Sequence, residues 1–146
     1  MKRYILLAIF SFFLITSCDK SSEEKIPKKD TYVIDNYTKK EVSIVMRDGA
    51  KLHTTIYSPK DTSKEYPILM QRTPYSSRPY GEVQMKTKIG PNVHLMKEGN
   101  IVVYQDVRGR WMSEGVYDNM RAYIPNKRAK QSDEVSDTYD TIDWLV

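Results

Sequence analysis

The amino-acid sequence predicts an α/β fold with a mixed sheet, in which an antiparallel hairpin is followed by strand, helix, strand and helix. Three observations predict it. Two β-rich runs are joined by an Asp-Gly pair, two short apolar runs are separated by the length of a crossover, and the last segment has apolar residues at helical spacing. This order is typical of the N-terminal half of a sheet that continues with further parallel strands, so we expect the 146 residues to hold an incomplete sheet.

The first element predicted is a β-hairpin. Residues 41–46 (EVSIVM) and 51–57 (KLHTTIY) are rich in β-branched residues, and Asp48-Gly49 between them is a strong hairpin turn signal. His53 alternates with Leu52 and Thr54 on the second strand, and we expect it to face solvent.

Two buried strands and a connecting helix should follow. Residues 67–71 (PILMQ) and 101–104 (IVVY) are short apolar runs bounded by turn residues, as in strands covered on both faces. Residues 93–98 predict a short helix that Gly99 would end. The separation of about thirty residues suits a right-handed crossover between parallel strands.

Residues 133–146 predict an amphipathic helix, with Ser132 as its N-cap. Its apolar residues, which we expect to cover the sheet, are Val135, Tyr139, Ile142 and Leu145. Its acidic residues Asp133, Asp137 and Asp140 recur at i, i+4 and i+7. That spacing favours a solvated helix face over a catalytic pair of carboxylates.

The N-terminus predicts export and lipid anchoring. Residues 1–17 combine a positive start, an apolar run and small residues before Cys18, which is typical of a bacterial lipoprotein signal peptide. A plain secretory signal or a short membrane helix is the alternative, although the run is shorter than the ~20 residues a spanning helix needs. We expect residues 18–38 to be the acylated cysteine and a flexible tether, and residues 39–146 to be the folded domain.

Composition excludes several classes of function. The formal net charge of +4 includes Lys2 and Arg3 of the signal, and the other basic residues are scattered, so we expect no nucleic-acid partner. With Cys18 as the single cysteine, neither a disulfide framework nor a thiolate metal cluster can form within the chain. His53 and His94 have no acidic partner at ligand spacing, so we predict no metal and no cofactor.

Four collinear motifs resemble a known family. They are MRDGAKL (46–52), RTPY (72–75), QDVRGR with SEG (105–110 and 113–115) and DTIDWL (140–145). Together they resemble the N-terminal part of the Xaa-Pro dipeptidyl-peptidase-like serine hydrolases, which include cocaine-esterase-type enzymes, glutaryl acylases and α-amino-acid ester hydrolases. The resemblance covers residues 41–146 and implies an α/β-hydrolase sheet and cleavage of ester or amide bonds through an acyl-serine intermediate.

In that family the serine, the aspartate and the histidine follow in this order, and the serine lies on a Gly-x-Ser-x-Gly turn. No such turn occurs in the sequence, and the resemblance places it after residues 140–145. We therefore expect the chain to be an N-terminal fragment that lacks the triad and is inactive alone.

The resemblance implies one catalytic role within the chain. Tyr75 matches the family tyrosine that donates its phenolic hydrogen to the oxyanion, whereas the residues alone would suggest only packing in a Pro-Tyr turn. Arg108 with Asp106 is either an anion-binding pair or, as we favour, a link between loops. Trp111 and Tyr117 either line a pocket mouth or cover the sheet edge.

Two other hypotheses compete with an exported hydrolase. The chain would be a lipid-anchored binding module, or the product of a decayed or frameshifted gene. As a hydrolase it would have a small-molecule or peptide substrate, and the membrane would be a second partner through the lipid. The sequence leaves the substrate and the oligomeric state open.

Overall fold

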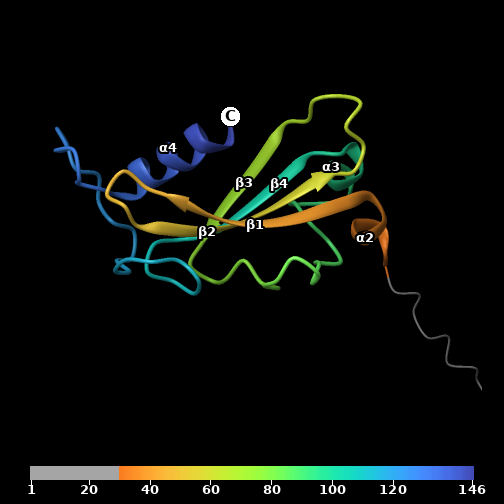
Figure 1. Ribbon diagram of the computed structural model, residues 1–146, viewed down its shortest axis with the longest axis horizontal. Helices are drawn as coiled ribbons and strands as arrows, with labels where there is room; N and C mark the ends of the chain where they lie inside the picture. The colour runs from red at the N-terminus through yellow and green to blue at the C-terminus, as the bar shows by residue number, and fades with distance from the viewer. Residues whose placement is uncertain (1–29) are drawn as a thin grey trace, which may run out of the picture.

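The computed structural model describes residues 30–146, and the predictions for the signal peptide and for Cys18 lie outside them. The described chain forms one four-stranded sheet with the strand order β1-β2-β4-β3 (Figure 1). Strand β2 pairs antiparallel with both β1 and β4, and β3 pairs parallel with β4. The mixed α/β sheet predicted from the sequence is confirmed.

The hairpin consists of β1 (Tyr37–Val45) and β2 (Lys51–Pro59), which pair along their whole length. Both strands are longer than predicted, because pairing extends to Tyr37 opposite Pro59. The turn is closed by the N–H of Met46, which donates to the carbonyl of Ala50 at 2.8 Å. Gly49 has φ +93°, a conformation that glycine adopts without steric cost.

The crossover consists of β3 (Ile68–Thr73), α3 (Val93–Glu98) and β4 (Ile101–Asp106). Asn92 caps the start of α3, and Gly99 ends it in the left-handed conformation, as predicted. In the parallel register Thr73 lies opposite Asp106, so both strands finish at the same edge of the sheet. Their following loops therefore start side by side.

The folded domain begins before the predicted boundary at residue 39. Helix α2 (Tyr32–Asn36) precedes β1, and its Val33 is fully buried beside Tyr37. The Tyr37 hydroxyl donates to the carbonyl of Met96 at 2.7 Å. Residues 32–38 are therefore packed rather than part of the predicted tether, because two apolar side chains in this polar stretch fill the core between β1 and α3.

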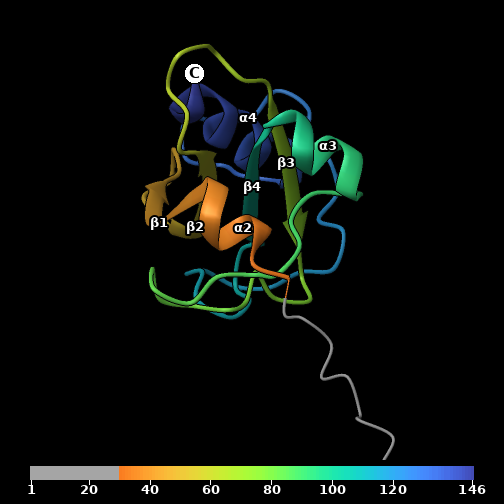
Figure 2. The same cartoon turned by 90° about the vertical axis from the view of Figure 1, so that its right-hand side faces the viewer.

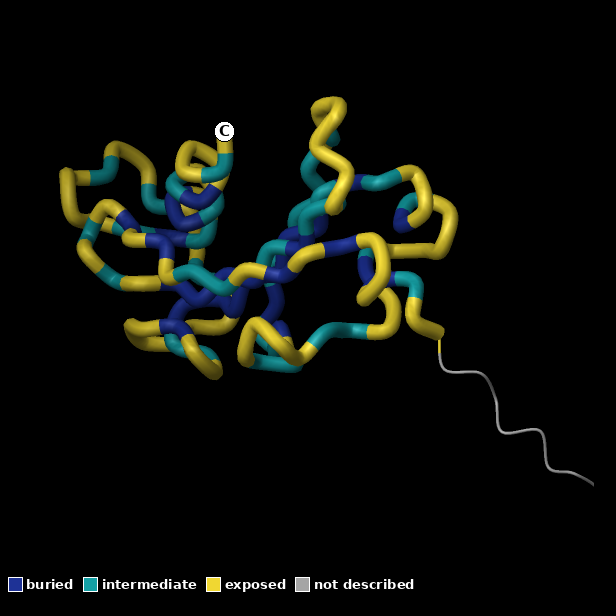
Figure 3. The backbone as a smooth tube through the Cα atoms, turned by 45° about the vertical axis from the view of Figure 1, so that its right-hand side comes forward, coloured by how far each residue is buried: buried dark blue, intermediate teal, exposed yellow. Residues whose placement is uncertain are grey.

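The two faces of the sheet are covered differently. On one face, α2, α3 and the loop after β3 pack around a core cluster. Its buried residues are Val33, Tyr37, Tyr57, Ile89, Met96, Val102 and Tyr104. In Figure 1, α4 (Glu134–Leu145) lies above the strands and the loop after β3 lies below them, and Figure 2 shows the arrangement from the side. Figure 3 shows that burial is concentrated in the strands.

Helix α4 packs on the sheet by its polar side, contrary to our prediction. Its buried residues are Ser136, Asp137 and Thr141. Three residues of the predicted apolar stripe, Val135, Tyr139 and Ile142, are exposed, and only Leu145 is half-buried. Gln105 explains the orientation, because its buried amide nitrogen donates to the hydroxyls of Thr141 (2.9 Å) and Thr54 (3.0 Å). The N-cap is Asp133 rather than Ser132, in a capping box with Ser136.

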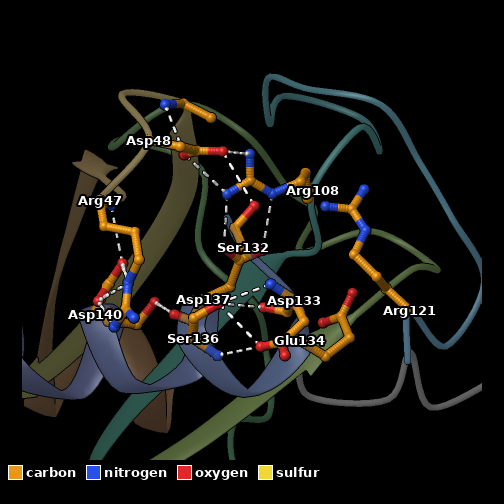
Figure 4. A network of polar contacts seen from close by, with 12 residues as sticks. Arg47, Asp48, Arg108, Arg121, Ser132, Asp133, Glu134, Ser136, Asp137 and Asp140 are labelled. Carbon is orange, nitrogen blue, oxygen red and sulfur yellow. Dashed lines mark hydrogen bonds and ion pairs between the residues drawn. The ribbon is translucent and has the colours of Figure 1, made fainter. Parts of the chain in front are cut away.

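The prediction that the acidic residues of α4 form a solvated face is wrong. Asp133 and Asp137 are buried, and Asp140 binds the guanidinium of Arg47 at 2.6 Å (Figure 4). The backbone N–H of Arg47 also donates to Asp140, at 2.9 Å. The acids therefore join α4 to the hairpin and to the loop before the helix.

These contacts predict that the fold loses stability in acid. Burial alone would raise the pKa of Asp48, Asp133 and Asp140, but hydrogen bonds from Arg108, Lys127 and Arg47 respectively lower each pKa below the usual range. Because the folded pKa values are depressed, this stabilisation is fully present above the unfolded value of about 4 and is lost as pH falls through the lowered pKa values.

The expected result is a melting temperature that falls as the pH is lowered from about 4 to 2, measured by thermal unfolding followed by circular dichroism. The Asp140→Asn variant should lose less stability on acidification than the wild type, since one of the titrating groups is gone. A melting temperature that stays constant over this range would contradict the assignment.

Candidate active site

The candidate site lies where β3 and β4 end, at the edge of the sheet where open α/β sheets place their ligands. Tyr75 follows Thr73, the last residue of β3, by two positions. Its side chain is 85% exposed, although it is aromatic. Among residues 30–146 no group forms a hydrogen bond with the Tyr75 hydroxyl, so the phenol is free to donate to a bound molecule.

The backbone that carries Tyr75 is held on both sides. The N–H of Tyr75 donates to the hydroxyl of Thr73 at 3.0 Å. The next residue, Ser76, has φ +105°, which non-glycine residues rarely adopt. The N–H of Ser77 then donates to the Asp106 carboxylate at 2.7 Å. Tyr75 therefore projects from a short turn whose two ends are fixed to β3 and β4.

The loop after β4 packs against the same turn. The carbonyl of Pro74 accepts a hydrogen bond from the Trp111 indole at 2.9 Å and one from the Nε of Arg110 at 3.2 Å. The guanidinium of Arg78 lies 4.8 Å from the Trp111 ring centre. Trp111, half exposed, thus covers the turn beside Tyr75, and two arginines bring positive charge to these loops.

Tyr117 also lies at this edge. The guanidinium of Arg110 is 4.8 Å from its ring centre, and its hydroxyl donates to Asn119 at 3.0 Å. A surface pocket next to Pro74 is lined by Tyr117 together with Val107, Asp118, Asn119, Met120 and Glu134. Tyr117 therefore lines a pocket, which is one of the two interpretations that the sequence left open.

Arg108 does not pair with Asp106. Its guanidinium binds Asp137 (2.7 and 2.9 Å) and Asp48 (2.8 and 3.1 Å), which joins α4 to the hairpin turn (Figure 4). The hydrogen bonds to Asp137 raise the pKa of Arg108 further above its usual range, against the opposing effect of burial. Of the two interpretations from the sequence, the link between elements is the one that the contacts support.

The other motif residues have structural roles. Arg72 of the RTPY motif donates to Gln105 at 2.7 Å and to Glu134 at 2.8 Å, which connects β3 with β4 and α4. Gly109 of the QDVRGR motif has φ +69°, and a Cβ atom there would lie 2.1 Å from the backbone nitrogen of Tyr117. Ser113 of the SEG motif donates to the carbonyl of Asp106 at 2.7 Å. These contacts hold the loops around Tyr75.

The two histidines are placed differently from each other. His53 was expected to face solvent but is buried, because the loop after β3 covers its side of the hairpin and its ring packs edge-on against Tyr80 at 5.3 Å. His53 Nε2 lies 3.7 Å from Glu41. His94 is exposed on α3. Within residues 30–146 no three histidine, cysteine or acidic side chains are grouped closely enough to hold a metal ion.

Comparison with known proteins identifies the family. A family model described as X-Pro dipeptidyl-peptidase (S15 family) matches residues 48–146. The chain belongs to this family. The resemblance seen in the four sequence motifs is thereby confirmed, and the four-stranded sheet is the part of the α/β-hydrolase fold that the chain contains.

The relatives are hydrolases of several kinds. Cocaine esterase from Rhodococcus sp. (strain MB1 Bresler) is 30% identical over 105 residues, which are 72% of this chain and 16% of that protein. A solved aminopeptidase from the marine sediment archaeon Thaumarchaeota archaeon has a TM-score of 0.64 and 37% identity, covering 84% of this chain and 20% of its own.

A solved α-amino acid ester hydrolase also has a TM-score of 0.64, with 34% identity over 89% of this chain and 21% of its own. The chain thus spans about a fifth of the length of these relatives. These matches support hydrolase activity for the family. The substrate that each name gives is a property of that relative alone.

Proposed function

We propose that this chain supplies the oxyanion-binding side of a serine hydrolase site, with Tyr75 as the donor. The observation that carries the proposal is the exposed phenol of Tyr75, with a free hydroxyl, on a turn fixed at the carboxyl edge of β3 and β4. Family membership supports it. The nucleophilic serine, its histidine and the aspartate would come from the remainder of a full-length protein, since no Gly-x-Ser-x-Gly occurs in these 146 residues.

The reaction would be hydrolysis of an ester or amide bond. The serine oxygen attacks the carbonyl carbon while the histidine takes its proton, and the carbonyl oxygen becomes an oxyanion. Tyr75 donates its phenolic hydrogen to that oxygen, together with a backbone N–H. Collapse of the intermediate expels an alcohol or amine, and water then releases the acid from the serine. Small esters and peptides both fit, as the named relatives include esterases and an aminopeptidase.

A fluorophosphonate probe, which reacts with activated serines, tests the proposal directly. The full-length protein should be labelled on one serine outside these 146 residues, and the 146-residue chain should not be labelled. Labelling of a serine within the 146-residue chain would overturn the assignment of the nucleophile to another part of the protein. A full-length protein that resists labelling and shows no hydrolysis would instead favour a binding module.

We also propose that the mature protein is exported and held on a membrane surface by acyl chains on Cys18. The small residues before Cys18 and the preceding apolar run support this. No helix among the described residues is long and apolar enough to cross a membrane. Several acyl chains, at ~0.8 kcal/mol per buried methylene, would keep the protein at the membrane.

The Cys18→Ser variant should lose its acyl chains and move from the membrane fraction to the soluble fraction, because serine has no thiol to accept the lipid. Cell fractionation and incorporation of radiolabelled palmitate would measure this. Ser21→Ala, which leaves the cysteine in place, should stay in the membrane fraction. Membrane retention of the Cys18→Ser variant without label would contradict lipid anchoring.

A further inference from the structure

We propose that Asp106 is a positioning residue that sets the location of Tyr75, so that oxyanion stabilisation depends on its buried carboxylate. This inference rests on the function proposed for Tyr75. Asp106 is the last residue of β4, is fully buried and lies opposite Thr73 in the parallel register. Its carboxylate therefore sits beneath the start of the turn that carries Tyr75.

The Asp106 carboxylate accepts hydrogen bonds from both loops of the site. Its Oδ1 accepts from the N–H of Ser77 at 2.7 Å. Its Oδ2 accepts from the Tyr80 hydroxyl at 2.8 Å and from the N–H of Met112 at 3.4 Å. Burial, reinforced by Asp106, raises the pKa of Tyr80, which keeps the phenol protonated as a donor. One side chain thus connects the turn after β3 to the loop after β4.

The Asp106 carboxylate forms hydrogen bonds but no ion pair among the described residues. Among residues 30–146 no lysine, arginine or histidine lies within 4 Å of its carboxylate. A buried carboxylate without an ion pair is stable only where neutral donors satisfy its oxygens. Asp106 therefore fixes the positions of Ser77 and Tyr80, because moving either residue would remove a hydrogen bond from the buried carboxylate.

Tyr75 lies between two fixed points, and Asp106 provides the second. Thr73 holds the backbone at Tyr75 itself, and Asp106 holds it two residues later at Ser77. Between them Ser76 keeps φ +105°, an unfavourable conformation for serine that persists only where neighbouring contacts impose it. The Ser76 hydroxyl also lies 3.1 Å from the Tyr80 hydroxyl that Asp106 binds.

The rest of the loop has a separate anchor, so loss of Asp106 should act locally. The ammonium group of Lys39 donates to the carbonyls of Gly81 (2.8 Å) and Gln84 (2.9 Å). Without Asp106 the loop would stay attached to β1 through Lys39, while the turn at residues 74–77 would lose its fixed end. We therefore expect Asp106→Asn to leave the fold intact and to displace Tyr75.

Asparagine is the informative substitution, because it keeps the shape of aspartate but has one acceptor oxygen instead of two. Its amide nitrogen would face either the N–H of Ser77 or the N–H of Met112, and the contact to that N–H would be lost, while in the second case the Tyr80 hydroxyl would have to accept where it now donates. A small displacement of a catalytic group can reduce the rate by about 100-fold. We expect kcat of the full-length protein on a 4-nitrophenyl ester to fall by about 10- to 100-fold in Asp106→Asn, with KM little changed.

Two measurements on the full-length protein separate this role from a general structural one. Hydrogen exchange followed by mass spectrometry should show faster exchange in peptides covering residues 74–80 of Asp106→Asn. In a double-mutant cycle with Tyr75→Phe, Asp106→Asn should cause a much smaller further decrease in kcat, since both changes remove the same interaction. Asp140→Asn is the matched control, because Asp140 holds Arg47 on the other face of the sheet.

Unchanged exchange at residues 74–80 in Asp106→Asn would overturn the proposal, and so would decreases in kcat that add independently in the double variant. Faster exchange in Asp140→Asn over the same residues would also overturn it, as the effect would not be specific to Asp106. If Tyr75→Phe keeps full activity, the function proposed for Tyr75 fails. Hydrogen exchange would still decide whether Asp106 fixes the turn.

Discussion

Replacing Tyr75 with phenylalanine is expected to lower kcat of the full-length protein by about 100-fold or more, because loss of one oxyanion donor costs about that much in related chemistry. Since the hydroxyl has no partner among the described residues, no structural hydrogen bond is lost with it. KM should change little, because the hydroxyl acts on charge that develops only in the transition state. Steady-state hydrolysis of a 4-nitrophenyl ester would measure both constants.

The matched control for Tyr75→Phe is Tyr117→Phe. Tyr117 lies at the same edge of the sheet, but its hydroxyl donates to Asn119. Its loss should reduce kcat far less than the loss of the Tyr75 hydroxyl. A Tyr75→Phe enzyme with a wild-type kcat, or equal losses in both variants, would remove the oxyanion role from Tyr75. Labelling by a fluorophosphonate should persist in both variants, since the nucleophile is untouched.

The strands could be predicted from the sequence because their signals are local. The Asp48-Gly49 turn and the β-branched runs specify the hairpin, and the apolar runs specify β3 and β4. The parallel direction of β3 and β4 then follows from the length of the crossover. These features depend on neighbouring residues in the chain, which a single sequence displays directly.

The orientation of α4 could not be predicted in this way, because apolar periodicity assumes that apolar side chains face the sheet. Here Arg72, Gln105 and Arg108 extend from the sheet region as polar partners, and the polar side of α4 satisfies them. No residue of α4 reveals that its partners, more than twenty positions away, are polar. The exposed apolar residues Val135 and Ile142 are a consequence of this match.

The candidate site was predictable only in part. The motif resemblance suggests Tyr75 as the oxyanion donor, and the parallel strands explain its place at the sheet edge. The sequence suggests Asp106 only as a partner of Arg108, because opposite charges close together in one motif suggest a pair. In a strand, residues two positions apart share a face, so Asp106 and Arg108 would share one only if β4 continued beyond Asp106. The strand ends there, and the two side chains bind different elements.

The largest effect on stability is expected for Arg108→Met. Arg108 and Asp137 are both buried, and Asp48 is the second partner of the guanidinium. Methionine keeps much of the length of arginine but leaves the Asp137 carboxylate buried with only a distant contact to Arg72, at 3.7 Å. Removal of one partner from a buried ion pair costs about 3–5 kcal/mol, so we expect a decrease of that size in the free energy of unfolding.

Urea denaturation followed by circular dichroism would measure the loss, and two further variants locate its cause. Arg47→Met removes a more exposed partner of Asp140 and should cost about 1 kcal/mol or less. Arg108→Met combined with Asp137→Leu should recover part of the lost stability, because the double variant buries no unpaired carboxylate at α4. If the double variant is less stable than Arg108→Met alone, the penalty comes from lost packing and not from the unpaired charge.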